Sequence, residues 1–205
     1  MDQFTFIFVV LFTLLGPFKL IPAFAGLTRG ADSRFKRDVA IWGVVIASVL
    51  CVFVALAGGT ILGNFRISLG GLRISAGLVL LVAALQIVFQ KAQSSSPSSG
   101  TPTAIQLAVS PVAAPMIVPP AGVAAILICM ALAPQHAGGI QAVAICLATM
   151  MVLDFLVMYF IDRVMKTPGL MIVLSVLGSV LVFVQLCLAV ETILNGLRSL
   201  GVLKV

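Results

Sequence analysis

Four ionisable side chains lie inside long apolar stretches of the sequence: Lys19, Arg73, Asp154 and Glu191. A charged side chain at the centre of a bilayer costs roughly 2.5–3.5 kcal/mol or more, so such residues generally face the protein interior and pair. Because two are basic and two acidic, we expect Lys19 to pair with Asp154 and Arg73 to pair with Glu191. The alternative for the second pair is that both side chains extend to the membrane interface.

Prolines interrupt two of the apolar stretches, at Pro17 and Pro22 in one and at four positions between 111 and 120 in the other. Proline leaves the carbonyl of residue i−4 without its helical partner and bends the axis. In lipid, such freed backbone groups are tolerated only where protein or a wet cavity satisfies them. We therefore expect these prolines to face one another or a cavity, the alternative being that they only kink helices for packing.

The interrupted stretches and the internal charges together predict a substrate site. Half-helix ends carry partial positive charge at N-termini and partial negative charge at C-termini, which matches the carboxylate and the ammonium of an amino acid. Either Asp154 or Glu191 could carry a coupling proton or ion, and the sequence does not choose between them. We expect gating or coupling by Arg73, Asp154 and Glu191, and substrate binding near Pro17, Lys19, Pro22, Pro111, Pro115 and Pro119.

Composition decides the class of protein to which these residues belong. Of 205 residues, 61% are hydrophobic and 9% are charged, whereas a soluble domain is roughly 45–50% apolar and about 25% charged. This balance excludes a soluble enzyme, a nucleic-acid-binding module and a disordered tail, and it makes the lipid bilayer the expected partner. The net charge of +6 therefore bears on orientation in the membrane, and no nucleic-acid partner is expected.

Six stretches are long and apolar enough to cross a membrane, since a bilayer core of ~30 Å needs about 20 residues of helix. A linker rich in serine, at about 90–103, separates the third stretch from the fourth. The expected spans are about 4–27, 39–62, 67–89, 104–132, 140–161 and 170–194.

The linker divides a single polytopic domain, residues 1–205, into repeat 1 at about 4–89 and repeat 2 at about 104–198. Each half has three spans and opens with a proline-interrupted helix. Because three is odd, tandem halves insert with opposite orientation, the inverted-repeat design of many secondary transporters. The expected fold is all-α, with six transmembrane helices in two inverted repeats and broken first and fourth helices. The alternative is that the halves look alike only because Gly and Pro are common in membrane helices.

Lysine and arginine are distributed unevenly between the loops. Loops one, three and five carry seven, at 29, 34, 36, 37, 91, 163 and 166, and the opposite side carries three, at 66, 198 and 204. The positive-inside rule then places both termini outside, with Lys19 and Asp154 in the inner half of the membrane and Arg73 and Glu191 in the outer half. We expect the first stretch to be a retained span rather than a signal peptide, because no basic residue precedes it.

Cysteine and histidine give no sign of a metal site, a disulfide or a catalytic centre. His136 is the one histidine, and each cysteine stands singly in an apolar stretch. We therefore expect no metal, no cofactor and no catalytic residue. The four cysteines are Cys51, Cys129, Cys146 and Cys187.

Two further features favour helix packing. The step from Gly71 to Ser75 is a pair of small residues four apart, which lets two helices approach closely. Polar amides can hydrogen-bond between helices, and we expect this role rather than substrate contact for Gln86, Gln185 and Asn195.

The order of several short motifs resembles that of MarC-family membrane proteins. The segments Leu-Gly-Pro-Phe-Lys-Leu-Ile-Pro-Ala-Phe at 15–24 and Gly-Leu-Thr at 26–28 are similar to the family's opening motif. Arg-Ile-Ser-Ala-Gly at 73–77 resembles its third span, and Pro-Val-Ala-Ala-Pro at 111–115 resembles its Pro-Leu-Ala-x-Pro segment. The chain departs from the family pattern at Gly16, which replaces an Asn, at the added charge Lys19, at residues 119–122, and at Glu191, which replaces a Gln.

The resemblance implies a six-span protein of the bacterial inner membrane, distantly related to LysE-type exporters, in a family with some members assigned to small neutral amino acids. We therefore expect a secondary transporter, for uptake or export of small polar solutes and first of small neutral amino acids, and not an enzyme. The alternatives left open are a scaffold or subunit and a membrane-embedded enzyme, each without transport activity of its own. A coupling proton or ion and a homo-oligomer are also left open.

Overall fold

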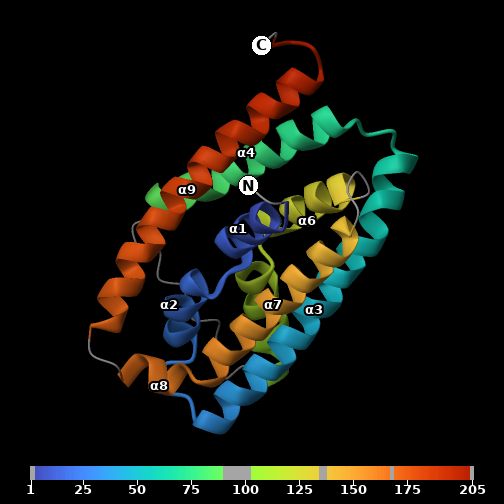
Figure 1. Ribbon diagram of the computed structural model, residues 1–205. Helices are drawn as coiled ribbons and strands as arrows, with labels where there is room; N and C mark the ends of the chain where they lie inside the picture. Colours follow the sequence, from blue (N-terminus) through green and yellow to red (C-terminus); the bar gives the residue numbers. More distant parts are fainter. Residues whose placement is uncertain (1–2, 90–102, 134–137, 167–168, 204–205) are drawn as a thin grey trace.

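The computed structural model describes residues 3–89, 103–133, 138–166 and 169–203, and every regular element in these ranges is a helix (Figure 1). The first span is broken in two, α1 (Gln3–Leu15) and α2 (Pro17–Leu27). Gly16 between them is extended, with φ −69° and ψ 160°. Pro17 is the first residue of α2, a position where its missing N–H would have no helical partner anyway. The break predicted at residues 16–17 is therefore present.

The second and third spans are the continuous helices α3 (Ser33–Asn64) and α4 (Leu69–Phe89). The expected second span began at about 39, but the helix begins at Ser33. The charged residues Lys36, Arg37 and Asp38 form its first turns. Hydropathy marks the apolar part of a helix, not the polar turns that extend it beyond the membrane, so the expected start was too late.

The fourth span is the most irregular, with α5 (Ala104–Leu107), η1 (Ala108–Ile117) and α6 (Pro120–Leu132). Ser110 and Ala114 have extended backbone angles inside η1. Each precedes a proline, whose ring disfavours the helical region for the residue before it. The axis bends by 59° between η1 and α6. The fourth helix is thus broken, as the prolines predict.

The last spans are α7 (Gly139–Tyr159), followed by the short α8 (Ile161–Lys166), and α9 (Leu170–Ser199). Gly138 and Gly169 precede α7 and α9 with φ values of 77° and 79°. This left-handed conformation is open to glycine at no steric cost, so the two turns into these helices depend on glycine.

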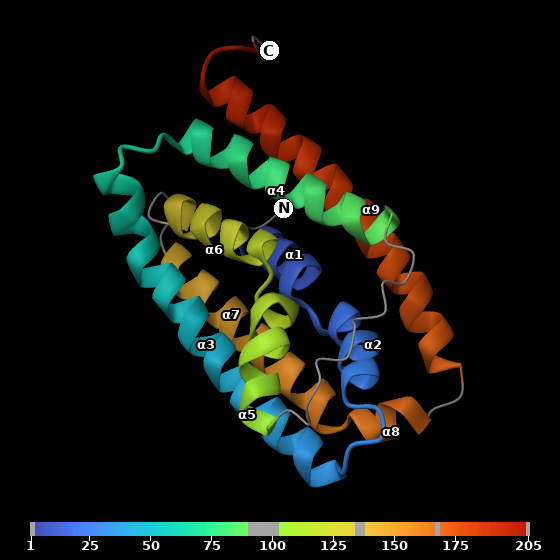
Figure 2. The same ribbon diagram turned by 180° about the vertical axis from the view of Figure 1, so that it is seen from behind.

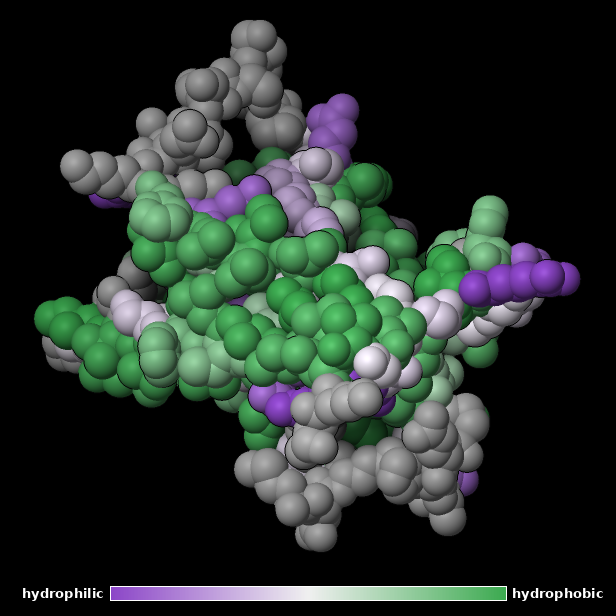
Figure 3. Space-filling model, turned by 90° about the horizontal axis from the view of Figure 1, so that it is seen from above, coloured by the Kyte–Doolittle hydropathy of each residue, from purple (hydrophilic) through white to green (hydrophobic). Residues whose placement is uncertain are grey.

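The helices confirm an all-helical membrane protein. Within the described residues, five helical stretches are long and apolar enough to cross a membrane, and the bent pair Ala104–Ile117 with Pro120–Leu132 makes a sixth if it forms one span. Many large apolar side chains are exposed, Leu56 and Phe183 among them. Figure 3, seen from above the view of Figure 1, shows apolar residues over much of the described part of that face, as expected for a surface that faces lipid tails rather than water.

Helix α7 lies against α1, α2 and α3, and α4 packs along α9 (Figures 1 and 2). The contact between α4 and α9 depends on glycine. A Cβ on Gly77 would lie 2.8 Å from the carbonyl oxygen of Ala189, and one on Gly196 would lie 2.9 Å from that of Gly70. The predicted step from Gly71 to Ser75 does not make this contact, because Gly71 is half-buried and Ser75 is exposed.

Candidate functional site

Two adjoining pockets open beside the break between α1 and α2. The first has a volume of about 680 Å³ and is lined by residues of α2, α4, the 115–121 segment and α9. The second, of about 620 Å³, is lined by α1, α2, the end of α4 and α9. Lys19, Ile87 and Gln185 line both pockets. These shared residues make the two hollows one candidate site with a single cationic side chain in its lining.

Lys19 lies where the helix break leaves backbone carbonyls without helical partners. Its Nζ donates a hydrogen bond to the carbonyl oxygen of Leu14, in the last turn of α1. The last carbonyls of a helix have no partner within it and carry partial negative charge, so a cation there is favourable. Gly16 N donates to the oxygen of Phe12 at 2.9 Å, which satisfies another of these carbonyls. The break therefore holds the ammonium group between the two pockets.

Gln185 joins the walls of the site. Its Nε2 donates to the carbonyl oxygen of Leu80 at 3.2 Å, which ties α9 to α4. The sequence predicted packing for the glutamines, and this hydrogen bond is of that kind. Gln185 also lines both pockets and Gln86 lines the first. Their amides are the polar lining that the predicted site residues did not include, and the available signal was a glutamine inside an otherwise apolar stretch.

The predicted substrate-binding residues divide into two sets. Lys19, Pro22, Pro115 and Pro119 line one or both pockets. Pro17 is buried at the start of α2, and Pro111 is half-buried in η1. Neither Pro17 nor Pro111 belongs to the pocket lining, because each stands at a turn of the chain that packs into the protein.

Asp154 lies in α7, on the face that also buries Met150 and Met158. Its side chain is fully buried, and neither carboxylate oxygen has a hydrogen-bond partner. The charge of Lys19 acts on it from α2, but the two groups do not form an ion pair in this conformation. The predicted partners Lys19 and Asp154 are thus close enough for their charges to interact. Lys19 donates to the Leu14 carbonyl instead, and Asp154 has no hydrogen-bond partner.

The predicted pair of Arg73 and Glu191 is wrong. Glu191 is exposed, accepts hydrogen bonds from Asn195 at 3.1 Å and from Arg198 at 3.3 Å, and forms its ion pair with Arg198. These partners lie on the same helix one and two turns further along, where α-helical spacing presents them to Glu191. Arg73 is half-buried on α4 and lines neither pocket. Arg73 and Glu191 therefore do not form an ion pair with each other.

A second polar cluster closes one end of the bundle. Asp162 accepts hydrogen bonds from Lys36 at 2.6 Å and from Ser33 at 2.9 Å, which links α8 to the start of α3. These hydrogen bonds favour the ionised form and hold the pKa of the Asp162 carboxyl below its ordinary value. Arg37 lies over the ring of Tyr159, 4.8 Å from its centroid. The cluster joins the two halves of the chain at the end that carries most of the basic residues.

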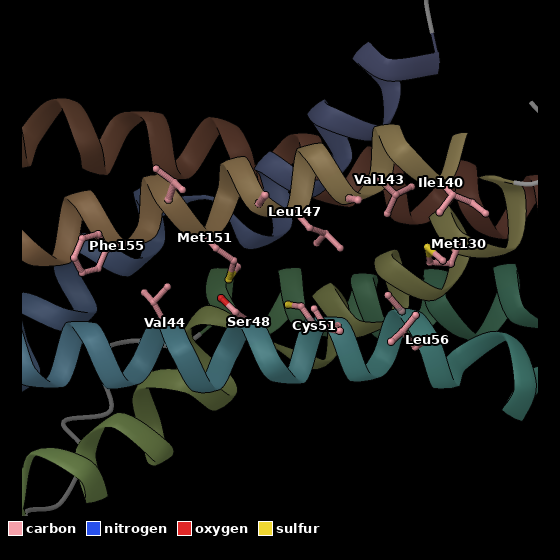
Figure 4. Close-up of a pocket in the computed structure, with 15 residues that line it drawn as sticks. Val44, Ser48, Cys51, Leu56, Met130, Ile140, Val143, Leu147, Met151 and Phe155 are labelled. Atoms are coloured by element: carbon pink, nitrogen blue, oxygen red, sulfur yellow. The ribbon is translucent and has the colours of Figure 1, made fainter. Parts of the chain in front are cut away.

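A third pocket, of about 610 Å³, is a groove between α3 and α7 with Met130 of α6 at one end (Figure 4). Its polar groups are the Ser48 hydroxyl and the Cys51 thiol, and the rest of its lining is apolar. No predicted site residue lines it. The groove suits an apolar ligand, because its lining has no charged side chain that could bind a polar solute.

Within the described ranges, no three His, Cys, Asp or Glu side chains gather where they could hold a metal ion. All four cysteines are free, and Cys187 is exposed. His136 lies outside the described residues. Among the described residues, the charged and amide groups of the candidate site are therefore Lys19 and the two glutamines, with the buried carboxylate of Asp154 on the neighbouring α7.

Comparison with known proteins bears on this arrangement. Residues 1–200 match the model of the MarC family, described as "MarC family integral membrane protein". The chain belongs to the MarC family. The match covers both broken helices and all the spans, so the resemblance seen in the short motifs is confirmed.

Relatives of this MarC-family chain occur in archaea and bacteria. The chain is 25% identical over 202 residues to the "UPF0056 membrane protein MJ1677" of Methanocaldococcus jannaschii, covering 97% of this chain and 98% of that protein. It is 24% identical over 130 residues to the "UPF0056 inner membrane protein YhgN" of Escherichia coli K12, covering 63% of this chain and 65% of that protein. No solved structure matches. The chain is thus an integral multi-pass membrane protein.

Proposed function

We propose that this protein is a secondary transporter of small polar solutes, with small neutral amino acids as the first substrate class, and not an enzyme. The observation that carries the proposal is the pair of pockets that share Lys19 and Gln185 at the break of the first span. An ammonium group recognises the carboxylate of an amino acid, and the Gln185 Oε1, which has no partner among the described residues, can accept from its ammonium.

The size and lining of the site support a small substrate. Volumes of about 680 and 620 Å³ fall within the ~300–1,000 Å³ of ordinary small-molecule sites. Apart from Lys19 and the two glutamines, the lining of the first pocket is apolar, which favours a substrate without a charged side chain. Lys19, Pro22, Pro115 and Pro119 would contact it, with Pro17 and Pro111 shaping the breaks and Arg73, Asp154 and Glu191 as gate or coupling charges.

Two inverted repeats are part of the proposal, and the packing is consistent with them. Exchanging the halves in chain order replaces α1 by η1, α2 by α6, α3 by α7 and α4 by α9. Under this exchange the contact of α1 with α7 becomes that of η1 with α3, and the contact of α2 with α9 becomes that of α6 with α4. The contacts of α3 with α7 and of α4 with α9 map onto themselves. The repeats would then move against each other around the site.

The membrane and the orientation are also proposed. YhgN of Escherichia coli is named as an inner membrane protein, and we place this chain in a bacterial cytoplasmic membrane. The end that carries Arg34, Lys36, Arg37, Arg163 and Lys166 would face the cytoplasm, since positive loops stay inside. Both termini would then lie outside.

Flux measurement tests the proposal. Purified protein in liposomes is expected to take up labelled glycine, L-alanine or L-serine, and to do so faster with an inward proton gradient. Liposomes that contain the Lys19→Gln variant, in which only this side chain differs, are expected to lose most of this flux. If wild-type protein moves none of the three, a scaffold or enzyme role replaces the transporter.

A further inference from the structure

The carboxyl group of Asp154 is buried without any polar partner, although burying such a group unpaired costs free energy. The side chain has no exposed surface, and neither Oδ1 nor Oδ2 accepts a hydrogen bond. An isolated ionised carboxylate away from water costs far more free energy than a neutral one, so such a group is neutralised. The Asp154 carboxyl therefore carries a proton in this conformation.

The groups that face Asp154 from the surrounding helices are few. Helix α7 packs against α1, α2, α3 and α6. Helix α1 has no ionisable side chain, α2 contributes Lys19 and α3 contributes the Cys51 thiol. The Cys129 thiol of α6 faces Cys146 of α7 rather than Asp154. At the end of α7, Asp162 of α8 is held by Lys36 and Ser33. Of the cations on α3, Lys36 pairs with Asp162 and Arg37 lies over Tyr159 at the end of α7. Lys19 is the cation whose charge acts on Asp154, so it is the one that we expect to neutralise Asp154 once the proton leaves.

Lys19 occupies a different place while Asp154 is neutral. Its Nζ donates to the carbonyl oxygen of Leu14, and its side chain lines both pockets of the candidate site. A single carbonyl engages only part of an ammonium group, which has three donor hydrogens. The ammonium is thus free to bind a carboxylate in the pockets, or to move toward an ionised Asp154, but not to neutralise both at once.

We propose that Asp154 is the binding site of the coupling proton, and that the charge of Asp154 decides whether Lys19 is available to bind the substrate carboxylate. With the proton bound, Lys19 stays in the pockets and binds the carboxylate of the substrate. When Asp154 releases its proton to water, the buried anion draws Lys19 away, and the pockets lose their positive charge. The inference rests on the proposed transport function and names the group that couples it to protons.

Proton binding at Asp154 and substrate binding at Lys19 must strengthen each other. If the bound proton raises the affinity for substrate, the bound substrate raises the affinity of Asp154 for the proton by the same factor. Substrate and proton then enter and leave together, and affinity is highest at low pH. A ligand without a carboxylate gains nothing from Lys19, so its binding does not respond to the proton on Asp154.

Binding of labelled L-alanine to the purified protein between about pH 5 and about pH 9 tests this linkage. Wild-type affinity is expected to fall by about tenfold or more as pH rises, which corresponds to the loss of one charge-assisted contact. Asp154→Asn, which keeps the shape of the protonated side chain, is expected to bind at every pH as tightly as wild type does at low pH. Asp154→Glu and the surface control Asp38→Asn are expected to keep the pH dependence. An Asp154→Asn protein whose affinity falls with pH like the wild type overturns the proposal.

Infrared spectroscopy tests the proton site without any substrate. Wild-type protein is expected to show a carboxylic-acid C=O stretching band at neutral pH that is absent in Asp154→Asn. In Lys19→Gln the band is expected to persist to higher pH, because no cation then stabilises the ionised carboxyl. A missing band, or one that Lys19→Gln leaves unchanged, overturns the inference even if alanine binds. If the band behaves as expected and no amino acid is transported, the proposed function fails and the proton site remains.

Discussion

The Nζ of Lys19 donates a hydrogen bond to the carbonyl oxygen of Leu14 across the break between α1 and α2. The break exists because Pro17 begins a new helix after the extended Gly16, which leaves the last carbonyls of α1 without helical donors. Lys19 follows two residues after Pro17 and so reaches back over its own break. A sequence feature that looked like a costly charge in the membrane thus has a local partner and lines both pockets.

Removing the charge of Lys19 is expected to weaken amino-acid binding by about 10- to 100-fold, since a hydrogen bond to a charged group contributes roughly 1.5–3 kcal/mol. Lys19→Gln keeps a donor for the Leu14 carbonyl and removes only the charge. Equilibrium binding of labelled L-alanine to detergent-purified protein measures the change. The matched control is Arg34→Gln, an exposed cation at the start of α3, which is expected to bind like wild type. Equal affinity of Lys19→Gln and wild type would remove Lys19 from the site.

A methyl group on Gly77 is expected to destabilise the contact between α4 and α9. Its Cβ would lie 2.8 Å from the carbonyl oxygen of Ala189, so the helices must separate, at a cost of about 1–3 kcal/mol. The matched control is Gly59→Ala in α3, where a Cβ meets nothing within 4 Å and the better helix propensity of Ala favours the fold. Thermal unfolding in detergent should give a lower Tm for Gly77→Ala and an unchanged or higher Tm for Gly59→Ala. The reverse order would contradict the close packing of these helices.

The hydrogen bonds of Asp162 are expected to stabilise the fold in a pH-dependent way. Because the pKa of Asp162 is lowered in the folded protein, the stabilisation is present above the unfolded-state pKa of about 3.9 and is lost as pH falls through the lower folded-state value. Asp162→Asn should therefore lower the Tm slightly near neutral pH and have no effect at strongly acid pH. The effect is small because the side chain is 45% exposed. Asp38→Asn, whose side chain has no partner among the described residues, should match wild type at both pH values.

The proposed orientation predicts which residues can be labelled from each side of the membrane. In a Cys187→Ser background, which removes the exposed native thiol, Arg34→Cys should react with a membrane-impermeant maleimide only in inside-out vesicles. Asn64→Cys, at the far end of α3, should react only in intact cells or right-side-out vesicles. Labelling of Arg34→Cys from outside would reverse the orientation and place the basic end in the periplasm.

The sequence predicted the elements of this fold well because apolar length and proline position act locally. Six stretches of sufficient length and two proline-rich interruptions were visible without a structure, and the helices break at Gly16 and between Ile117 and Pro120. Helix ends outside the membrane were less accurate. Helix α3 begins at Ser33 and includes charged residues in its first turns, which a hydropathy pattern does not assign to a membrane span.

Side-chain partners could not be predicted in the same way. The sequence analysis paired the ionisable residues by the sign of their charge and their expected depth in the membrane. Glu191 instead forms an ion pair with Arg198 on its own helix. Lys19 donates to a backbone carbonyl, a partner that every residue has and that a sequence pattern therefore does not identify. The close contact of α4 and α9 uses Gly77 and Gly196 rather than the step from Gly71 to Ser75, because helix rotation decides which small residues face a neighbour.

Protection of a cysteine in the site by substrate tests the central claim most directly. Ala83 lines the first pocket, whereas Ala144 lines the apolar groove between α3 and α7. In the Cys187→Ser background, L-alanine is expected to slow the maleimide labelling of Ala83→Cys and to leave that of Ala144→Cys unchanged. Labelling of Ala83→Cys at the same rate with and without glycine, L-alanine or L-serine would contradict a substrate site between the broken first helix, α4 and α9.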